Sequence, residues 1–231
     1  AAVAQSMKRG LLRYGPLPWL LPLVGVLALA SLAIGSTAMP VLDGLWQWLR
    51  GEHSLAAIVI GEIRLPRTLL ALAAGACLGL AGAALQGLLR NPLADPSLTG
   101  ASQGAALGAA AVFYFGLFPA LGGFATALGG LAGALAALGL VLWLAGAGNP
   151  SRVILAGLAV STVAGASLAA VLTLAPNPYA LQELVFWLMG SVADRGLEQL
   201  WVLLPALLLG SALLWWQRGL LHALSLGDRD V

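Results

Sequence analysis

Few residues of this chain are of the types that perform covalent chemistry. The two histidines, His53 and His222, lie far apart in the sequence, and Cys77 is the only cysteine. This spacing gives no Ser-His-Asp or Cys-His pairing and no set of metal ligands. Lys8 is the only lysine, and it does not belong to the G-x-x-x-x-G-K-[ST] pattern of an ATP-binding P-loop. We therefore expect no enzyme active site, no metal site and no cofactor.

The polar residues that do form a pattern lie in a short segment between two apolar, glycine-rich stretches. This segment, residues 86–97, contains the run R-N-P-L-A-D-P. Its two prolines end helices and remove backbone donors, and the Asn and Asp before them can cap the local backbone. On the residues alone, the segment is predicted to be a rigid turn. The candidate hinge residues are Gln86, Arg90, Asn91, Pro92, Asp95 and Pro96.

The composition identifies the environment of the elements around this segment. Of the 231 residues, 60% are hydrophobic and 9% are charged, whereas soluble domains carry roughly 25% charged residues. Residues 96–151 include no Asp, Glu, Lys, Arg or His, and one membrane-spanning helix needs about 20 apolar residues. The predicted fold class is therefore all-α, a polytopic bundle of membrane helices. No basic face could follow a phosphate backbone, so we expect no nucleic-acid partner.

Six apolar stretches have the length of membrane spans, and breaker residues separate them. Between the first two, Val41–Leu49 has apolar residues at helical spacing and two tryptophans, which predicts a helix lying in the membrane interface. Tyr179–Val192 is a second amphipathic segment outside the spans. The predicted spans are Leu17–Ile34, Leu69–Leu89, Leu98–Phe118, Phe124–Ala145, Val153–Leu174 and Leu200–Trp216.

The basic residues predict the orientation of these spans. Six spans place both termini on one side, and cytoplasmic segments carry the excess of basic residues. With the N-terminus in the cytoplasm, seven basic residues lie inside and four outside. The sequence therefore predicts cytoplasmic termini. The inner residues are Lys8, Arg9, Arg13, Arg90, Arg152, Arg218 and Arg229, and the outer ones are Arg50, Arg64, Arg67 and Arg195.

The predicted spans carry no acidic or basic residue near their centres. Ion-coupled carriers usually need such a residue in the membrane. The pattern therefore disfavours an ion-coupled secondary transporter, and energy for uphill transport would have to come from another chain.

Small residues recur four positions apart in several of the spans. In lipid, such residues let helix backbones approach closely and gain dispersion contacts. We therefore expect them to lie at helix–helix contacts. The series are Gly75 and Gly79; Gly100, Gly104 and Gly108; Gly129 and Gly133; and Gly157, Ser161 and Gly165.

Two motifs, in a fixed order, resemble those of a known family. The first is R-L-P-R at residues 64–67, and the second is the R-N-P-L-A-D-P run at residues 90–96. Together with the glycine-rich stretch between them, they closely resemble the FecCD-type permeases, the membrane subunits of ABC importers for iron-siderophores, haem and cobalamin. Leu155-Ala156-Gly157 and F-W-L-M-G-S at 186–191 resemble later parts of that family. The resemblance covers Ile58 to Asp228.

This resemblance implies an architecture and a set of partners. The family has ten spans per subunit and works by alternating access at a dimer interface in the bacterial cytoplasmic membrane. The implied partners are a second permease subunit, ATP-binding subunits on the cytoplasmic side and a periplasmic or lipoprotein substrate-binding protein outside. The implied cargo is an iron chelate, either an iron-siderophore or haem, with cobalamin as another candidate.

The resemblance also implies roles for individual residues. Arg64 and Arg67 would hold carboxylates of the binding protein, for which planar guanidinium groups are well suited. Leu226, Gly227 and Asp228 resemble the start of the loop that contacts the ATPase, so residues 1–231 resemble a single permease domain that stops there. The implied path residues are Val160, Thr162, Val163, Ser167 and Thr173, and the implied outer gate contains Val185, Phe186, Trp187 and Met189.

A second interpretation is a non-transporting membrane scaffold, a remnant of such a permease. The stop at Val231 favours it, whereas the arginine pair and the W-M-G stretch disfavour it. The importer permease is therefore the leading hypothesis, and an ion-coupled carrier is the third.

Overall fold

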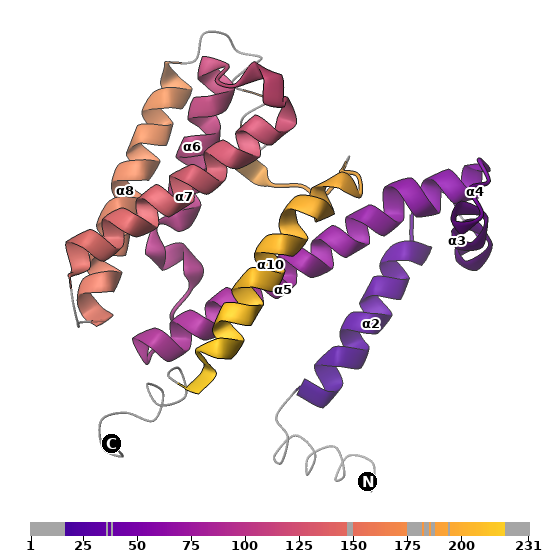
Figure 1. Cartoon of the computed structure of the whole chain (residues 1–231), viewed down its shortest axis with the longest axis horizontal. Coiled ribbons are helices and arrows are strands. Elements are labelled where there is room, and N and C mark those ends of the chain that lie inside the picture. The colour runs from indigo at the N-terminus through magenta and orange to yellow at the C-terminus, as the bar shows by residue number, and fades with distance from the viewer. Residues whose placement is uncertain are drawn as a thin grey trace, which may run out of the picture. The chain divides into compact units, whose positions relative to one another are not determined.

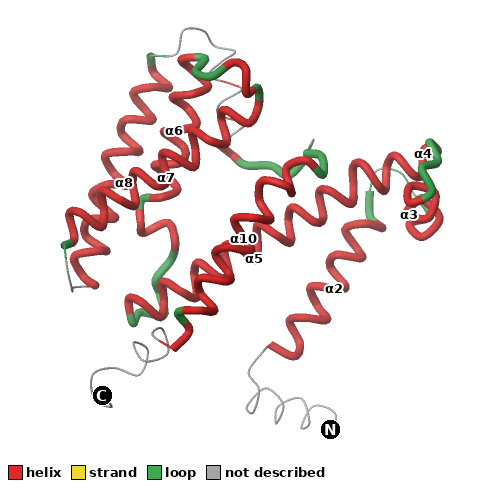
Figure 2. Tube along the Cα trace, viewed as in Figure 1, coloured by secondary structure: helices red, strands yellow, loops and turns green. Residues whose placement is uncertain are grey.

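A computed structural model describes residues 17–35, 37, 39–146, 150–174, 182, 185, 188–193 and 195–219 of the chain. Within these ranges the chain forms helices joined by short loops and no strand (Figure 1, Figure 2), which confirms the all-α prediction. The chain divides into two compact units, one made of Ala1–Gly75 with Val192–Leu207 and the other of Ala76–Ser191 with Leu208–Val231.

The first unit contains the start of a long continuous helix. A short helix (α4, Leu55–Ala57), a π-helix (η1, Ile58–Arg64) and α5 (Leu65–Leu89) follow one another without a break. The prediction that this span begins at Leu69 is therefore wrong. Pro66 fits inside the helix because the π register ends beside it, where the N–H of the preceding residue bonds to a carbonyl five residues back.

Three further helices complete the first unit. α2 (Leu17–Ala33) matches the first predicted span to within a residue, and α3 (Val41–Leu49) has the bounds predicted for the interfacial helix. α10 (Glu198–Trp216) begins in this unit. There its Leu200 packs on the first turns of α5 in a buried apolar cluster.

The second unit contains three helices that pack on one another, α6 (Ala101–Phe115), α7 (Gly123–Ala145) and α8 (Pro150–Thr173) (Figure 1). Two 3-10 turns, η2 (Pro96–Thr99) and η3 (Pro119–Leu121), precede α6 and α7. The third predicted span is shorter than expected because glycines in the left-handed conformation bound α6 at both ends. The fifth starts earlier than expected because a proline suits the first turn of a helix.

Glycines bring α6 and α7 into backbone contact. A Cβ at Gly108 would lie 2.2 Å from the carbonyl oxygen of Gly129, and a Cβ at Gly133 would lie 2.1 Å from that of Gly104. No side chain fits at such distances, so the crossing depends on close backbone approach. The predicted packing role of these glycines is confirmed.

The glycines of α5 behave differently. Around the Cβ positions of Gly75 and Gly79, no other atom of the described structure lies within 4 Å. The expectation that this pair lies at a helix contact is therefore not met within these residues.

Each predicted span has a helix as its counterpart. Among the described residues, four helices are long and apolar enough to cross a membrane, and two shorter ones are apolar. The four are Leu55–Leu89, Phe124–Ala145, Pro150–Thr173 and Glu198–Trp216, and the shorter two are Pro18–Ala33 and Ala101–Phe115.

Candidate partner-docking and translocation site

The two arginines of the R-L-P-R motif lie in different environments. Arg64 is the last residue of η1 and is 8% exposed, whereas Arg67 lies in the first turn of α5 and is exposed. In the sequence the two arginines look equivalent, because both precede the predicted span.

The guanidinium of Arg64 binds the end of α2. Its Nη1 donates to the carbonyl oxygens of Leu32 at 2.9 Å and Ala33 at 3.1 Å, and its Nη2 donates to that of Thr37 at 2.6 Å. The last carbonyls of a helix have no partner within the helix and carry partial negative charge, so a cation is favourable there. A Cβ at Gly35 would lie 2.3 Å from Nη2 of Arg64, so a larger residue there would displace the guanidinium from this position.

Two hydroxyl groups add to the contact between α2 and the long helix, one helical turn after Arg64. The Thr68 hydroxyl donates to the carbonyl oxygen of Arg64 at 2.9 Å, and Oγ of Ser31 lies 2.9 Å from Oγ1 of Thr68. Because the Thr68 proton is already used, Ser31 is the donor in the second bond. α2 is therefore fixed to the long helix by a short polar network. The roles of Ser31, Gly35 and Thr68 were not predicted, because the residues that they contact include ones distant in the sequence.

Arg67 borders an open cleft. The cleft has a volume of about 650 Å³ and is also lined by the end of α2 and by Ile63 and Arg64. With Arg64 bound to α2, Arg67 is the member of the pair whose side chain is exposed. The docking role predicted for the pair stays a prediction.

The start of the hinge is held by its own side chains. α5 ends in a Schellman motif, in which the N–H of Asn91 bonds to the carbonyl of Gln86 at 3.2 Å and Arg90 adopts a φ of 50°. Oδ1 of Asn91 then accepts from the N–H of Leu93 at 2.9 Å, and Nε2 of Gln86 donates to the carbonyl of Pro92 at 3.0 Å. The predicted capping by Asn91 is confirmed.

The second half of the hinge begins η2. Oδ1 of Asp95 accepts from the N–H of Ser97 at 2.8 Å, which confirms the predicted cap. Hydrogen bonds from the Ser97 hydroxyl and N–H lower the pKa of the exposed Asp95 carboxyl, because they favour its charged form. Thr99 closes the turn by donating to the carbonyl of Pro96 at 2.7 Å.

The hinge leads into η2, whose last residues, Leu98 and Thr99, are packed tightly on α8. A Cβ at Gly157 would lie 1.9 Å from the carbonyl oxygen of Leu98 and 3.3 Å from Cα of Thr99. A Cβ at Gly100, which has a φ of 74°, would lie 3.1 Å from Cγ1 of Val160. The loop that follows α5 is therefore seated on the first half of the helix that carries the predicted path residues.

The five predicted path residues lie on two faces of α8. Val160 is buried against α7. It also borders an apolar pocket of about 410 Å³ between α6, α7 and α8, together with Val163 and Ser167. Thr162 and Thr173 lie on the other side and are exposed, and each hydroxyl donates to the carbonyl four residues earlier at 2.8 Å. Their path role stays a prediction, but the five residues cannot share one surface.

Gln103 of α6 borders the exposed face of α8. The Gln103 side chain is exposed, and its Oε1 lies 3.7 Å from the position that a Cβ would take at Gly165. An uncharged carboxamide therefore lies against α8 at Gly165. Gln103 was not predicted as a site residue, although a glutamine in the first turn of an otherwise apolar helix is unusual enough to indicate one.

Several predicted site residues cannot be placed. Of the described gate residues, Val185 and Met189 are exposed. No three His, Cys, Asp or Glu side chains gather as a metal site in the part of the chain that the structure describes. Outside the described residues lie Phe186 and Trp187 of the outer gate and Leu226, Gly227 and Asp228 of the ATPase contact.

The apolar helices define the class of this chain, a multi-pass membrane protein. The model of the FecCD transport family matches residues 23–230. The chain therefore belongs to the FecCD transport family, as the two sequence motifs predicted.

Curated relatives and a solved structure agree with this assignment. The chain is 36% identical over 216 residues to the hemin transport system permease protein HmuU of Yersinia pestis, covering 89% of this chain and 63% of the relative. It is 38% identical over 220 residues to the ferric enterobactin transport system permease protein FepD of Escherichia coli, covering 91% and 63%.

The solved structure is described as an inward-facing conformation of a metal-chelate type ABC transporter. It matches with a TM-score of 0.74 and 29% identity, covering 91% of this chain and 63% of that chain. The chain thus spans less than two thirds of the length of these proteins.

Proposed function

We propose that this chain is part of the membrane-spanning permease subunit of an ATP-driven importer for an iron chelate. The observation that carries the proposal is the family match over residues 23–230. Relatives named for hemin and ferric enterobactin transport support iron chelates as cargo. Other relatives are named for cobalamin and molybdate import, so the cargo is the first point to test.

The proposed path follows the exposed face of α8. Thr162 and Thr173 lie on this face, whereas Val160 is buried against α7. The face is uncharged, and its hydroxyl groups already donate to the helix, so each offers acceptor lone pairs to a passing solute. Such a surface suits a bulky chelate that is handled by shape and weak polar contacts.

The proposed mechanism is alternating access driven by partner ATPases. The hinge would lie on the cytoplasmic side with the N-terminus, and it is seated on α8 at Gly157. A displacement of the hinge would therefore act directly on the proposed path helix. Leu226, Gly227 and Asp228 are proposed to contact the ATPase, and a second permease subunit is proposed to complete the path.

The proposed docking site for a substrate-binding protein is the cleft beside Arg67. Arg67 is exposed and can meet a carboxylate of the partner, whereas Arg64 fixes the end of α2 that forms the cleft wall. Val185, Phe186, Trp187 and Met189 are proposed to form the outer gate.

Co-purification tests the partners. The full-length gene product is tagged in its own host, solubilised gently and analysed by mass spectrometry for stoichiometric partners. We expect a P-loop ATPase and a second copy of the permease. An intact, folded permease that brings down no ATPase would overturn the importer proposal.

Uptake into vesicles tests the cargo. The purified complex is reconstituted with its binding protein and ATP, and uptake of haem, a ferric siderophore, cobalamin and molybdate is compared. A complex whose ATPase lacks its catalytic glutamate serves as the control. We expect ATP-dependent uptake of an iron chelate, and uptake of cobalamin or molybdate alone would correct the cargo.

A further inference from the structure

α3 has three different surfaces around its axis. At about 100° per residue, Leu42, Trp46 and Leu49 fall on one face of the helix. Asp43 and Arg50 fall on the edge next to it. All five residues are exposed, so an apolar stripe and a polar edge lie side by side on the uncovered part of this helix.

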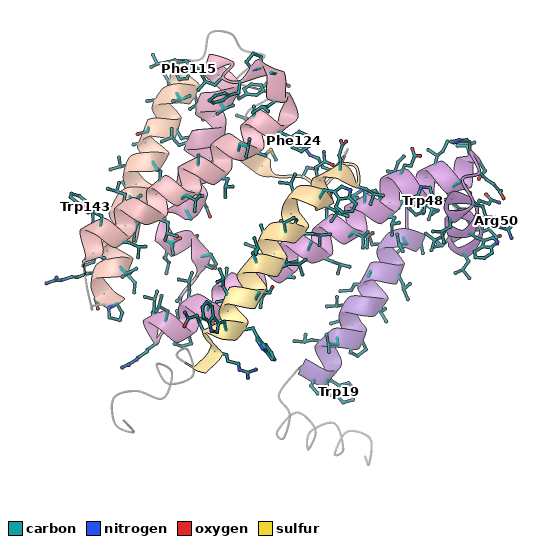
Figure 3. All side chains as sticks on the ribbon, in the orientation of Figure 1. Trp19, Trp48, Arg50, Phe115, Phe124 and Trp143 are labelled. Atoms are coloured by element: carbon teal, nitrogen blue, oxygen red, sulfur yellow. The ribbon has the colours of Figure 1, made fainter. Side chains whose placement is uncertain are left out.

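The remaining surface of α3 is packed on the long helix. A Cβ at Gly44 would lie 2.8 Å from both the carbonyl oxygen of Ala56 and Cγ1 of Ile60. Trp48 lies on Gly61, where a Cβ would be 2.1 Å from two atoms of the indole ring. Figure 3 labels Trp48 and Arg50 on this helix. Because the packed side leaves almost no free space, the orientation of α3 relative to η1 is fixed.

The exposed stripe is strongly apolar. Leu42 is 82% exposed, Trp46 57% and Leu49 64%. At its edge, the Arg50 guanidinium lies 4.7 Å from the centroid of the Trp46 ring and 3.9 Å from a carboxylate oxygen of Glu52. The tryptophan therefore has an apolar body on the stripe and a cation over its ring.

We infer that α3 lies on the membrane surface, with Leu42, Trp46 and Leu49 turned toward the lipid and Asp43 and Arg50 toward water. α3 connects two apolar helices, and the Arg64 network fixes the end of α2 beside η1, the element on which α3 packs. This arrangement places α3 at the level where both helices leave the hydrocarbon. The membrane interface is also where Trp and Arg are favourable together, because lipid phosphates can accept from the guanidinium.

A lipid surface fits this stripe better than a docking protein. A transport partner that binds and leaves would return Leu42, Trp46 and Leu49 to water in every cycle. Exposure of an apolar patch to water is unfavourable. Lipid covers the stripe permanently. The charged edge beside it gives the helix the amphipathic pattern of interfacial helices.

Site-directed spin labelling tests the inference. Cys77 is the only cysteine of these residues, so Leu42→Cys, Leu49→Cys and Asp43→Cys can each carry a nitroxide in a Cys77→Ser background. The full-length permease is placed in phosphatidylethanolamine–phosphatidylglycerol vesicles. Collisions with oxygen, which is enriched in lipid, are compared with collisions with a water-soluble nickel chelate. We expect oxygen to dominate at positions 42 and 49 and nickel at position 43.

The other outcomes overturn the inference. Dominance of nickel at all three positions would mean that α3 lies in water, and low accessibility to both reagents at 42 and 49 would mean that protein covers the stripe. If a spin label disturbs the helix, quenching of the native tryptophan fluorescence by brominated lipids tests the same inference without a label. Quenching should fall more in Trp46→Phe than in Trp48→Phe, and equal losses would contradict the inference. Neither assay requires transport, so failure here leaves the importer proposal untouched.

Discussion

At the end of α2 a charged side chain makes the helix contact, whereas at the crossing of α6 and α7 the two backbones approach each other directly at glycines. From an almost fully buried position, Arg64 reaches the carbonyl oxygens of Leu32 and Ala33 at the end of α2 and that of Thr37 in the segment after it. Gly108 and Gly133 instead bring two backbones together with no room for a Cβ. Glycine is used at both contacts: Gly35 leaves space for a guanidinium that could shift, whereas Gly108 and Gly133 face backbone oxygens.

The difference follows from what each site offers. A helix end carries unpaired carbonyls that a guanidinium can satisfy, so a polar contact is favourable there. The middle of an apolar helix has its backbone groups already paired, and lipid competes equally for apolar side chains. Close approach of small residues is then the remaining source of contact energy.

Adding methyl groups to the α6–α7 crossing should have the largest effect. For Gly108→Ala with Gly133→Ala we expect a loss of about 3–5 kcal/mol in the free energy of unfolding, since both Cβ atoms would strike backbone oxygens. Unfolding of the full-length protein in mixed SDS micelles, followed by circular dichroism, measures it. The control is Gly139→Ala in α7, where no atom lies within 4 Å. Equal stability of the two variants would contradict the close crossing.

Removal of the positive charge at Arg64 should have the second largest effect on the free energy of unfolding. Arg64→Gln should lower the free energy of unfolding by about 1.5–3 kcal/mol, because hydrogen bonds from a charged group to the last carbonyls of α2 are lost. Arg67→Gln, at the exposed position of the same motif, should change it by less than about 0.5 kcal/mol. Arg64→Lys should fall between them. If both Gln variants were equally stable, the polar network would not be what holds α2.

Substitution of Gly157 tests whether the contact between the hinge and α8 depends on close backbone approach, as the α6–α7 crossing does. Gly157→Ala should cost about 1–2 kcal/mol, since the Cβ strikes the Leu98 carbonyl but the short turn can move more easily than a helix. Gly165→Ala on the same helix is the control, because its Cβ would meet Gln103 at an ordinary 3.7 Å. The two variants are compared by thermal unfolding in detergent. An equal effect would show that the hinge is not seated on α8.

Substitution of Asp95 should have the smallest effect on stability, and this effect should be visible only at acidic pH. Because hydrogen bonds from Ser97 lower its pKa below the ordinary 3.8, the cap stabilises the folded hinge above that value and is lost as the pH falls through the lowered pKa. Asp95→Asn keeps a capping oxygen without titrating. Between pH 7 and pH 3, the parent protein should therefore lose stability relative to this variant. Parallel pH profiles would show that the cap contributes nothing measurable.

Much of the fold was predictable because it depends on local chemistry. The apolar runs predicted six helices, and the caps at Asn91 and Asp95 followed from residues beside them. α3 was predicted with its observed bounds because its apolar residues recur with helical spacing. The family followed from two motifs whose residues are contiguous in the sequence.

The start of the second span was not predictable in the same way. The apolar stretch predicted a helix that begins at Leu69, yet the helix continues from a π register through Pro66. The residues of this π-helix contact distant parts of the chain, with Gly61 against Trp48 and Arg64 against the end of α2. Rules based on neighbouring residues in the sequence cannot predict these contacts.

The sequence by itself therefore determined the class of protein, the number of apolar helices and the identity of the family. Only the tertiary structure decided that Arg64 caps α2 while Arg67 is exposed, and that Val160 is buried while Thr162 is exposed. The physical reason is that membership of a span depends on the hydrophobicity of contiguous residues, whereas the role of one side chain depends on which distant backbone lies within its reach.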